Sequence, residues 1–286
     1  MKKFTLIFMS MFTLGAVTLT SCSKKEGCTD PVATNFDADA QKDDGSCIYE
    51  DTDVHVDDHS TSSHVTINFN HNFAGLPVNK SLFNQFNYVN ANNDTLSINK
   101  LRYLISDIKL YLYNGDSIQM GSYRLIDLET PTTASYYVGH VTKGSYAAIG
   151  FNFGFDSLDN MGNYTDLNAA NWNWPSMIGG GYHNMQFEGK FMANGVATNY
   201  AYHNGTASNM GNYNQNHIHV ILGGVSLNQE YCTININMDL SQWFENPIIW
   251  DLNVLNSMLM PNYTAQLMMH ANGYNVFSLG NTVQKQ

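Results

Sequence analysis

The chain has 286 residues, a formal net charge of −11 at pH 7, and a composition that is 43% hydrophobic and 13% charged. A chain of this length can bury one sizeable core. Because 24 acidic residues oppose 13 basic ones and no basic patch occurs, the composition excludes a nucleic-acid partner.

The N-terminal stretch has the form of an export signal. Two lysines precede an apolar run from residue 4 to about residue 19, and small residues then lead to Cys22. A cysteine directly after Leu-Thr-Ser resembles a bacterial lipobox. We therefore predict a signal peptide over residues 1–21 and a lipid on Cys22 that anchors the protein to the outer membrane, facing the periplasm or the exterior. The alternative is an ordinary signal peptide with an incidental cysteine.

An acidic spacer is predicted over residues 22–63. Between Glu26 and His59 the chain carries eleven acidic residues and one basic residue, a pattern typical of a self-repelling linker. Cys28 and Cys47 bracket the short loop GCTDPVATNFDADAQKDDGSC, which could hardly fold without a bridge. We predict that these two cysteines form a disulfide and that Cys232 stays reduced. Calcium on the loop's aspartates is a lesser alternative, because their spacing is not that of an EF-hand.

Residues 64–286 show the alternation of β-strands. The segment HVTINFNHNF places Val65, Ile67, Phe69, His71 and Phe73 on one face, and YCTININMDL does the same with Cys232, Ile234, Ile236 and Met238. Asn114-Gly115 inside an alternating run predicts a hairpin, and Asn262 and Gly273 bound a late helix. We expect an all-β fold, an antiparallel β-sandwich or barrel-like domain with a short late helix, preceded by the acidic linker.

The histidines divide by the strand face that each one shares. Alternation puts His71 beside Ile67 and Phe69, and it puts His183 with Met185 and Phe187, so both imidazoles are expected to point toward the core. A buried imidazole needs partners for its ring nitrogens, and a metal is one that satisfies it strongly. The competing interpretation is an ordinary core histidine bonded to a hydroxyl or carbonyl.

Three further histidines are less certain ligands. His203 lies among alternating tyrosines, which leaves its direction open. His217 and His219 oppose an apolar face and are expected to be exposed, although His-x-His is also a compact chelate. His217 and His219 are therefore the weaker candidates, and His203 stays among the main ones.

The order of several motifs resembles the MbnP-like family of exported proteins, in the lipoprotein branch found in Bacteroidota. The motifs are INFNHNFAG, LSINKLRYLISDIKLYL, SYRLIDL, KGSYAAIGFNFGFDS, LNAANWNWPSMIGGGYHNMQFEG and YAYHNG. The resemblance implies a β-rich fold and one copper ion held by two histidines and a kynurenine, which a partner dihaem enzyme of the peroxidase type makes by oxidising a tryptophan. It assigns His71 and His203 as ligands, and Trp172 and Trp174 as the Trp-x-Trp pair, with Trp174 preferred for oxidation.

One stretch departs from the family pattern. PSMIGGGYHNM is longer and richer in glycine, and it places His183 directly after the tyrosine. We expect the glycines to fold the backbone over the site and His183 to converge with His71 and His203. The tryptophans could instead simply pack a loop against the sandwich.

The sequence thus predicts a lipid-anchored copper-binding protein of the cell envelope, serving acquisition, storage or handling. We expect no enzymatic activity, because the chain lacks a nucleophile elbow, an HExxH zinc motif and paired carboxylates at a meaningful spacing. The alternative is a structural or carbohydrate-facing surface lipoprotein without a metal, whose aromatic loop contacts a ligand or partner.

Overall fold

The computed structural model describes residues 24–31, 33–48 and 61–286. The chain divides into two compact units between Asp57 and Asp58. The predicted signal peptide and Cys22 lie outside the described residues. Within the described part of the chain, no helix has the length and apolar character needed to cross a membrane.

The smaller unit is a loop closed by a disulfide. Cys28 and Cys47 are bonded to each other, as predicted, and a short parallel pair forms between β1 (Glu26–Gly27) and β2 (Lys42–Asp43). Cys232 belongs to the larger unit, where it is a free and buried thiol.

The aspartates of the small unit bond to the loop itself. Asp37 accepts a hydrogen bond from Lys25 Nζ at 2.9 Å, and Asp44 accepts one from the backbone N–H of Ser46 at 2.9 Å. Among the described residues, no three His, Cys, Asp or Glu side chains gather as they would around a metal ion.

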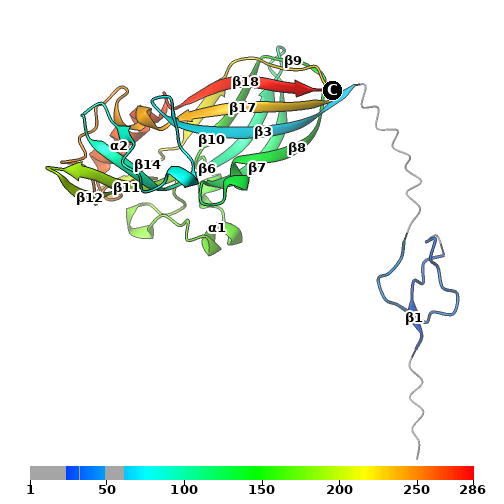
Figure 1. Cartoon of the computed structure of the whole chain (residues 1–286). Coiled ribbons are helices and arrows are strands. Elements are labelled where there is room, and N and C mark those ends of the chain that lie inside the picture. The colour runs from blue at the N-terminus through cyan, green and yellow to red at the C-terminus, as the bar shows by residue number, and fades with distance from the viewer. Residues whose placement is uncertain (1–23, 32, 49–60) are drawn as a thin grey trace, which may run out of the picture. The chain divides into compact units, whose positions relative to one another are not determined.

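The larger unit consists of two β-sheets packed face to face (Figure 1). The first sheet contains, in spatial order, β12 (Val196–Asn204), β11 (Met185–Ala193), β6 (Thr95–Tyr111), β10 (Ala148–Phe153) and β15 (Ile218–Leu222), with β5 (Tyr88–Val89) and β7 (Ser117–Asp127) also paired to β6. The second contains β18 (Phe277–Lys285), β17 (Tyr231–Asp239), β3 (Ser62–Phe73) and β4 (Leu76–Pro77), with β8 (Ser135–Thr142) paired to β3.

Short elements complete the unit. Two small antiparallel pairs join β13 (Ala207–Asn209) to β14 (Asn212–Asn214) and β9 (Gly144–Tyr146) to β16 (Val225–Leu227). The helices are α1 (Thr165–Ala169) and α2 (Tyr263–Gly273), with 3-10 turns η1 (Lys80–Leu82), η2 (Pro131–Ala134), η3 (Asp159–Met161), η4 (Ser176–Ile178) and η5 (Leu240–Phe244).

Strand alternation builds the main core, as predicted. The apolar residues of β3 and β17 are buried: Val65, Ile67, Phe69, Phe73, Cys232, Ile234, Ile236 and Met238. They pack against inward-facing residues of the first sheet such as Tyr103, Phe151 and Phe153. Both sheets remain open, so the fold is a sandwich rather than a barrel.

One pairing departs from the antiparallel expectation. β3 and β17 run parallel, with Val65 beside Cys232 and Ile67 beside Ile234. Two strands with the same alternating pattern can pair in either direction, because a strand's own side-chain pattern does not encode the direction of its neighbour.

The predicted hairpin and late helix are both present. β6 and β7 are antiparallel neighbours joined at Asn114-Gly115, where Gly115 has a φ of +93°. Helix α2 begins after Asn262, whose side chain accepts a hydrogen bond from Ala265 N–H at 3.0 Å, and it ends at Gly273. The sequence predicts both elements correctly because a turn and a helix start each depend only on neighbouring residues.

A second, smaller core lies on the outer face of the first sheet. Leu104 of β6 points away from Tyr103, its neighbour in the main core, and packs with four residues of the segment that follows β10: Phe155, Leu167, Trp172 and Tyr182. Helix α1 and the adjoining loops cover this face (Figure 1). This small core fixes the aromatic segment described next.

Candidate functional site

The tryptophan-rich segment folds as a closed loop over the outer face of the first sheet. Asn173 and Tyr182 form an antiparallel bridge, and the backbone N–H of Trp174 donates to the carbonyl of Gly181 at 2.8 Å. Between them the chain turns through η4 and three successive glycines with positive φ: Gly179, Gly180 and Gly181. Side chains rarely adopt this conformation, so the glycine run is what allows the loop to close.

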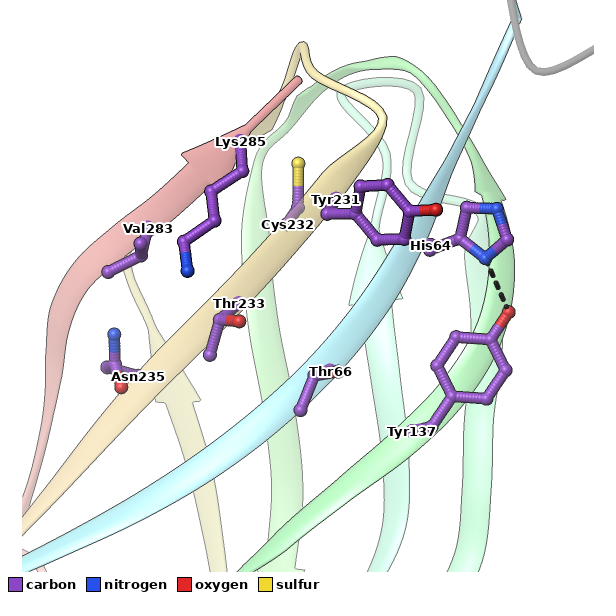
Figure 2. Close-up of a pocket in the computed structure, with 9 residues that line it drawn as sticks. All are labelled: His64, Thr66, Tyr137, Tyr231, Cys232, Thr233, Asn235, Val283 and Lys285. Carbon is purple, nitrogen blue, oxygen red and sulfur yellow. Dashed lines mark hydrogen bonds between the residues drawn. The ribbon is translucent and has the colours of Figure 1, made fainter.

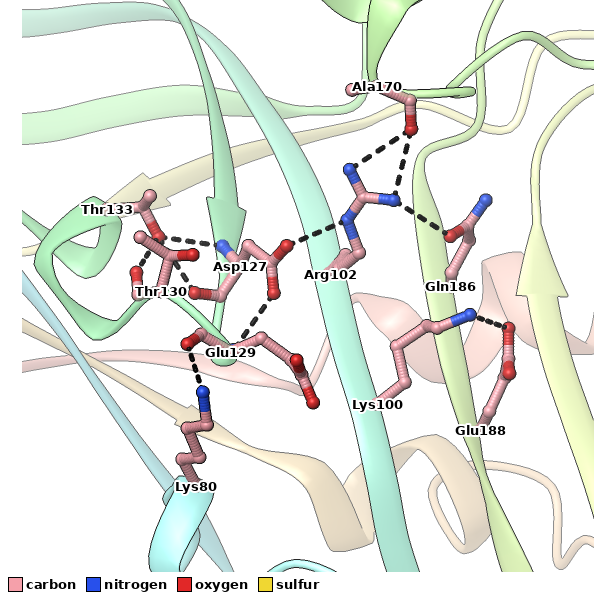
Figure 3. Close-up of polar contacts among 10 residues, drawn as sticks. All are labelled: Lys80, Lys100, Arg102, Asp127, Glu129, Thr130, Thr133, Ala170, Gln186 and Glu188. Carbon is pink, nitrogen blue, oxygen red and sulfur yellow. Dashed lines mark hydrogen bonds and ion pairs between the residues drawn. The ribbon is translucent and has the colours of Figure 1, made fainter.

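The guanidinium of Arg102 packs against the ring of Trp172. Its ring is fully buried, and the guanidinium carbon of Arg102 lies 5.1 Å from the ring centroid. Arg102 in turn pairs with Asp127 at 3.1 Å and donates to the carbonyl of Ala170 at 3.3 Å (Figure 3). The indole therefore sits on a fixed, charged platform provided by β6 and β7.

His183 lies between the two tryptophans. Its ring centroid is 5.4 Å from that of Trp172 and 4.9 Å from that of Trp174, and the residue is 5% exposed. Within the part of the chain that the structure describes, the Nδ1 atom of His183 and the indole Nε1 of Trp172 are buried and have no hydrogen-bond partner. Burial lowers the pKa of His183 from 6.5 to about 3, so this imidazole is neutral near pH 7.

The predicted face of His183 is wrong. Strand alternation predicts that His183 shares the inner face with Met185 and Phe187, but its ring packs outside the first sheet, under the tryptophan loop. β11 begins only at Met185, so residue 183 precedes the regular strand and does not follow its alternation.

His203 approaches His183 from the neighbouring strand. It lies on β12 opposite Gln186, on the outer face, and the two imidazole centroids are 5.3 Å apart. Its Nε2 lies 2.9 Å from Glu188 Oε1, and Lys100 Nζ lies 2.8 Å from the same oxygen. We call Trp172, Trp174, His183 and His203 the tryptophan–histidine cluster.

The Glu188 carboxylate orients His203. Its hydrogen bond with His203, together with that from Lys100, lowers the pKa of Glu188 to about 2, although burial opposes the shift. An ionised carboxylate can only accept, so His203 donates through Nε2–H, and the neutral tautomer with this hydrogen has its lone pair on Nδ1. Figure 3 shows the Lys100–Glu188 pair beside the Arg102 platform.

Comparison with known proteins identifies the family. A family model described as MbnP matches residues 62–261, which is most of the chain. The chain belongs to the MbnP family. A solved structure, MbnP from Methylosinus trichosporium, is 14% identical, with a TM-score of 0.46 over 66% of this chain and 79% of that one.

A second similarity is short. The chloroplastic ribulose bisphosphate carboxylase/oxygenase activase of Oryza sativa subsp. japonica is 52% identical over 40 residues, which are 14% of this chain. The chain spans 9% of the length of that relative.

His71 lies elsewhere in this MbnP-family chain. Its Nε2 is 2.9 Å from the hydroxyl of Tyr103, which points into the main core, and burial lowers the pKa of His71 to about 4. His203 and Glu188 lie on the opposite face of the first sheet. The expected convergence of His71 with His183 and His203 is therefore wrong, because the backbone of the sheet separates them.

The two weaker candidates are also outside the cluster. His219 is exposed on β15, and its Nδ1 bonds to Asn152 at 2.9 Å. The carbonyl of His217 accepts from His270 Nε2 at 3.3 Å, and its Nδ1 is buried with no partner in residues 24–31, 33–48 and 61–286. Three strands (β11, β6 and β10) lie between β15 and β12, which carries His203.

Sequence reasoning missed the charged residues beneath the cluster. Lys100, Arg102 and Glu188 occupy outward positions of β6 and β11, which a sequence pattern assigns to solvent. The alternation could have placed Glu188 and His203 on one face only if the β11–β12 register had been known, since they are not directly opposite.

Proposed function

We propose that the protein binds one copper ion at the tryptophan–histidine cluster. The observation that carries this proposal is the Nδ1 of His183, which is buried beside a second imidazole and finds no hydrogen-bond partner among the described residues. An unsatisfied buried polar atom costs roughly 1–3 kcal/mol, which binding of a metal ion would offset. In the neutral state that its low pKa favours, His183 can act as a ligand near pH 7.

The separation of the two imidazole rings fits an ion held between them. With metal–nitrogen distances of about 2.0 Å, two coordinated rings have centroids about 5–6 Å apart, and the observed separation is 5.3 Å. Imidazole nitrogens suit copper, which also has the highest affinity in the divalent series. Glu188 and Lys100 would hold His203 in the required tautomer, as partners of metal-bound histidines commonly do.

The tryptophans would exclude water and supply the remaining contact. Two imidazoles alone leave a copper ion under-coordinated, and an intact indole N–H is a donor without a lone pair to offer. The family resemblance suggests that one indole is oxidised to kynurenine by a dihaem partner of the peroxidase type, which would bring the oxidant. Trp174, whose ring lies nearer to His183, is the preferred position, and Trp172 is the alternative.

The biological role that fits this site is copper acquisition, storage or handling without catalysis. A buried ion beneath two aromatic rings is poorly placed to meet a substrate. The predicted export signal and the lipobox-like position of Cys22 support a lipid-anchored location in the cell envelope.

Metal analysis of protein purified without a histidine tag tests the proposal. After loading with copper and dialysis against a chelator, the protein should retain about one equivalent. His183→Ala and His203→Ala should lose it, whereas His71→Ala, a matched change of a buried histidine, should keep it. Circular dichroism on each variant checks that the β-sandwich is intact.

The contrary outcome is equally specific. Retention of copper by both cluster variants, or no retention by the unaltered protein before and after treatment with an oxidising partner, would reject the site. The surface lipoprotein without a metal would then be the better account.

A further inference from the structure

A second pair of histidines lies on the other sheet. His64 on β3 and His140 on β8 are direct partners in the antiparallel register. His64 points outward, since its neighbour Val65 is fully buried in the core. Side chains of register partners project to the same face, so both imidazoles stand together on the outer surface of the second sheet.

The two rings are already at contact distance. His140 Nε2 lies 3.1 Å from His64 Nδ1, and the hydroxyl of Tyr137 lies 3.1 Å from the same His64 atom. Tyr231 stacks on His64 with centroids 4.9 Å apart and an interplanar angle of 17°. Figure 2 shows His64 between the rings of Tyr231 and Tyr137.

This separation is the one that a chelated ion requires. Two nitrogens that each lie about 2.0 Å from a metal ion, at angles between square-planar and tetrahedral, are about 2.8–3.3 Å apart. The nitrogens of His64 and His140 fall inside that interval at 3.1 Å. The ring centroids are 4.2 Å apart, so the two rings would turn apart, toward the separation of about 5–6 Å, as their mutual hydrogen bond is exchanged for a shared ion.

We propose that His64 and His140 form a second, surface metal site for a divalent transition-metal ion, with Tyr137 as a third donor. Among such ions Cu(II) is bound most strongly by nitrogen and oxygen donors. The stacked Tyr231 fixes His64, which reduces the ordering that binding would otherwise require.

The environment of this pair favours rapid exchange. His140 is exposed, Tyr137 and Tyr231 are 57% and 49% exposed, and a pocket of about 460 Å³ opens beside His64. Lys285 lines the pocket from β18, away from Tyr137 (Figure 2). An ion here would be taken up and released readily, in contrast to one buried beside His183.

The proposal does not depend on the buried copper site. It makes the second sheet a surface where the protein could receive or hand over a metal ion. A variant without the tryptophan–histidine cluster should therefore still bind at the surface pair, so the two proposals can fail separately.

The test is a titration of the tag-free mature protein with Cu(II) in a glycine buffer. Calorimetry measures the binding isotherm, and electron paramagnetic resonance identifies the donor atoms. We expect a chelator-exchangeable ion whose spectrum shows two nitrogen donors. His140→Gln and His64→Gln should each weaken it at least tenfold, since the second donor of a chelate acts at high effective concentration. Tyr137→Phe should weaken it less.

The control is His219→Gln, which alters an exposed strand histidine on the other sheet and should leave the isotherm unchanged. Thermal unfolding followed by circular dichroism confirms that each variant is folded. No exchangeable ion in the unaltered protein, an unchanged isotherm in His140→Gln, or an equal loss in His219→Gln would overturn the proposal.

Discussion

Acidification should destabilise the copper-free protein through His183. In the unfolded chain this imidazole gains a proton below about pH 6.5, but burial keeps it neutral in the folded protein until about pH 3. A lowered folded-state pKa of a histidine means that stability is full above pH 6.5 and is lost as the pH falls toward 3.

The size of the loss follows from the pKa. Between pH 6.5 and pH 5, each pH unit lowers the free energy of unfolding by about 1.4 kcal/mol. Protonation of His183 in the unfolded chain should therefore lower the free energy of unfolding by about 2 kcal/mol at pH 5. Residues that titrate far from the tryptophan–histidine cluster, such as His71, contribute equally to the unaltered protein and to a His183→Gln variant, and they cancel in the comparison.

Urea unfolding at pH 7 and pH 5 measures this term. The drop in unfolding free energy between the two pH values should be smaller in copper-free His183→Gln than in the unaltered protein, by about 2 kcal/mol. Comparing drops removes the effect of the substitution on absolute stability. Equal drops in the two proteins would refute the assignment of His183 as a buried neutral imidazole.

Two further predictions concern the support of the cluster. Gly181→Ala should lower the free energy of unfolding in urea by about 1–3 kcal/mol more than Gly195→Ala does. Both glycines have a φ near +80°, so the backbone strain is matched. An added Cβ at Gly181 would lie 2.4 Å from the Asn160 side chain, whereas nothing lies within 4 Å at Gly195. Equal losses would contradict this contact. Glu188→Gln should weaken copper retention about tenfold in a chelator competition, because it removes the charge that orients His203; unchanged retention would show that the carboxylate is dispensable.

The fold was largely predictable because its signals are local. Alternation along β3 and β17, Asn114-Gly115 in the hairpin and Asn262 at the start of α2 each act within a few residues. The parallel direction of β3 and β17 was not predictable, since it depends on which strands meet across the sandwich.

The sequence identifies most residues of the candidate site, but it does not show how they come together in space. The motif containing Trp172, Trp174 and His183, together with His203, identified four residues that lie in contact. Strand alternation could not show that His183 precedes the regular part of β11, and it therefore placed the ring on the wrong face.

The pairing of strands that are distant in the sequence determines whether His71, Glu188 and Lys100 lie at the site. Family resemblance and an inward strand face both predict that His71 joins the cluster, yet the first sheet lies between them. Glu188 and Lys100 were overlooked because charged residues on outward strand positions normally face solvent. Only the packing of the tryptophan loop over that face converts them into supports of His203.

X-ray absorption at the copper edge tests the central claim most directly. Protein loaded with one equivalent of copper should show outer-shell scattering from two imidazoles at metal–nitrogen distances of about 2.0 Å. His203→Ala should retain one imidazole at most, while His71→Ala should match the unaltered protein. A spectrum that loses an imidazole in His71→Ala and is unchanged in His203→Ala would contradict the account.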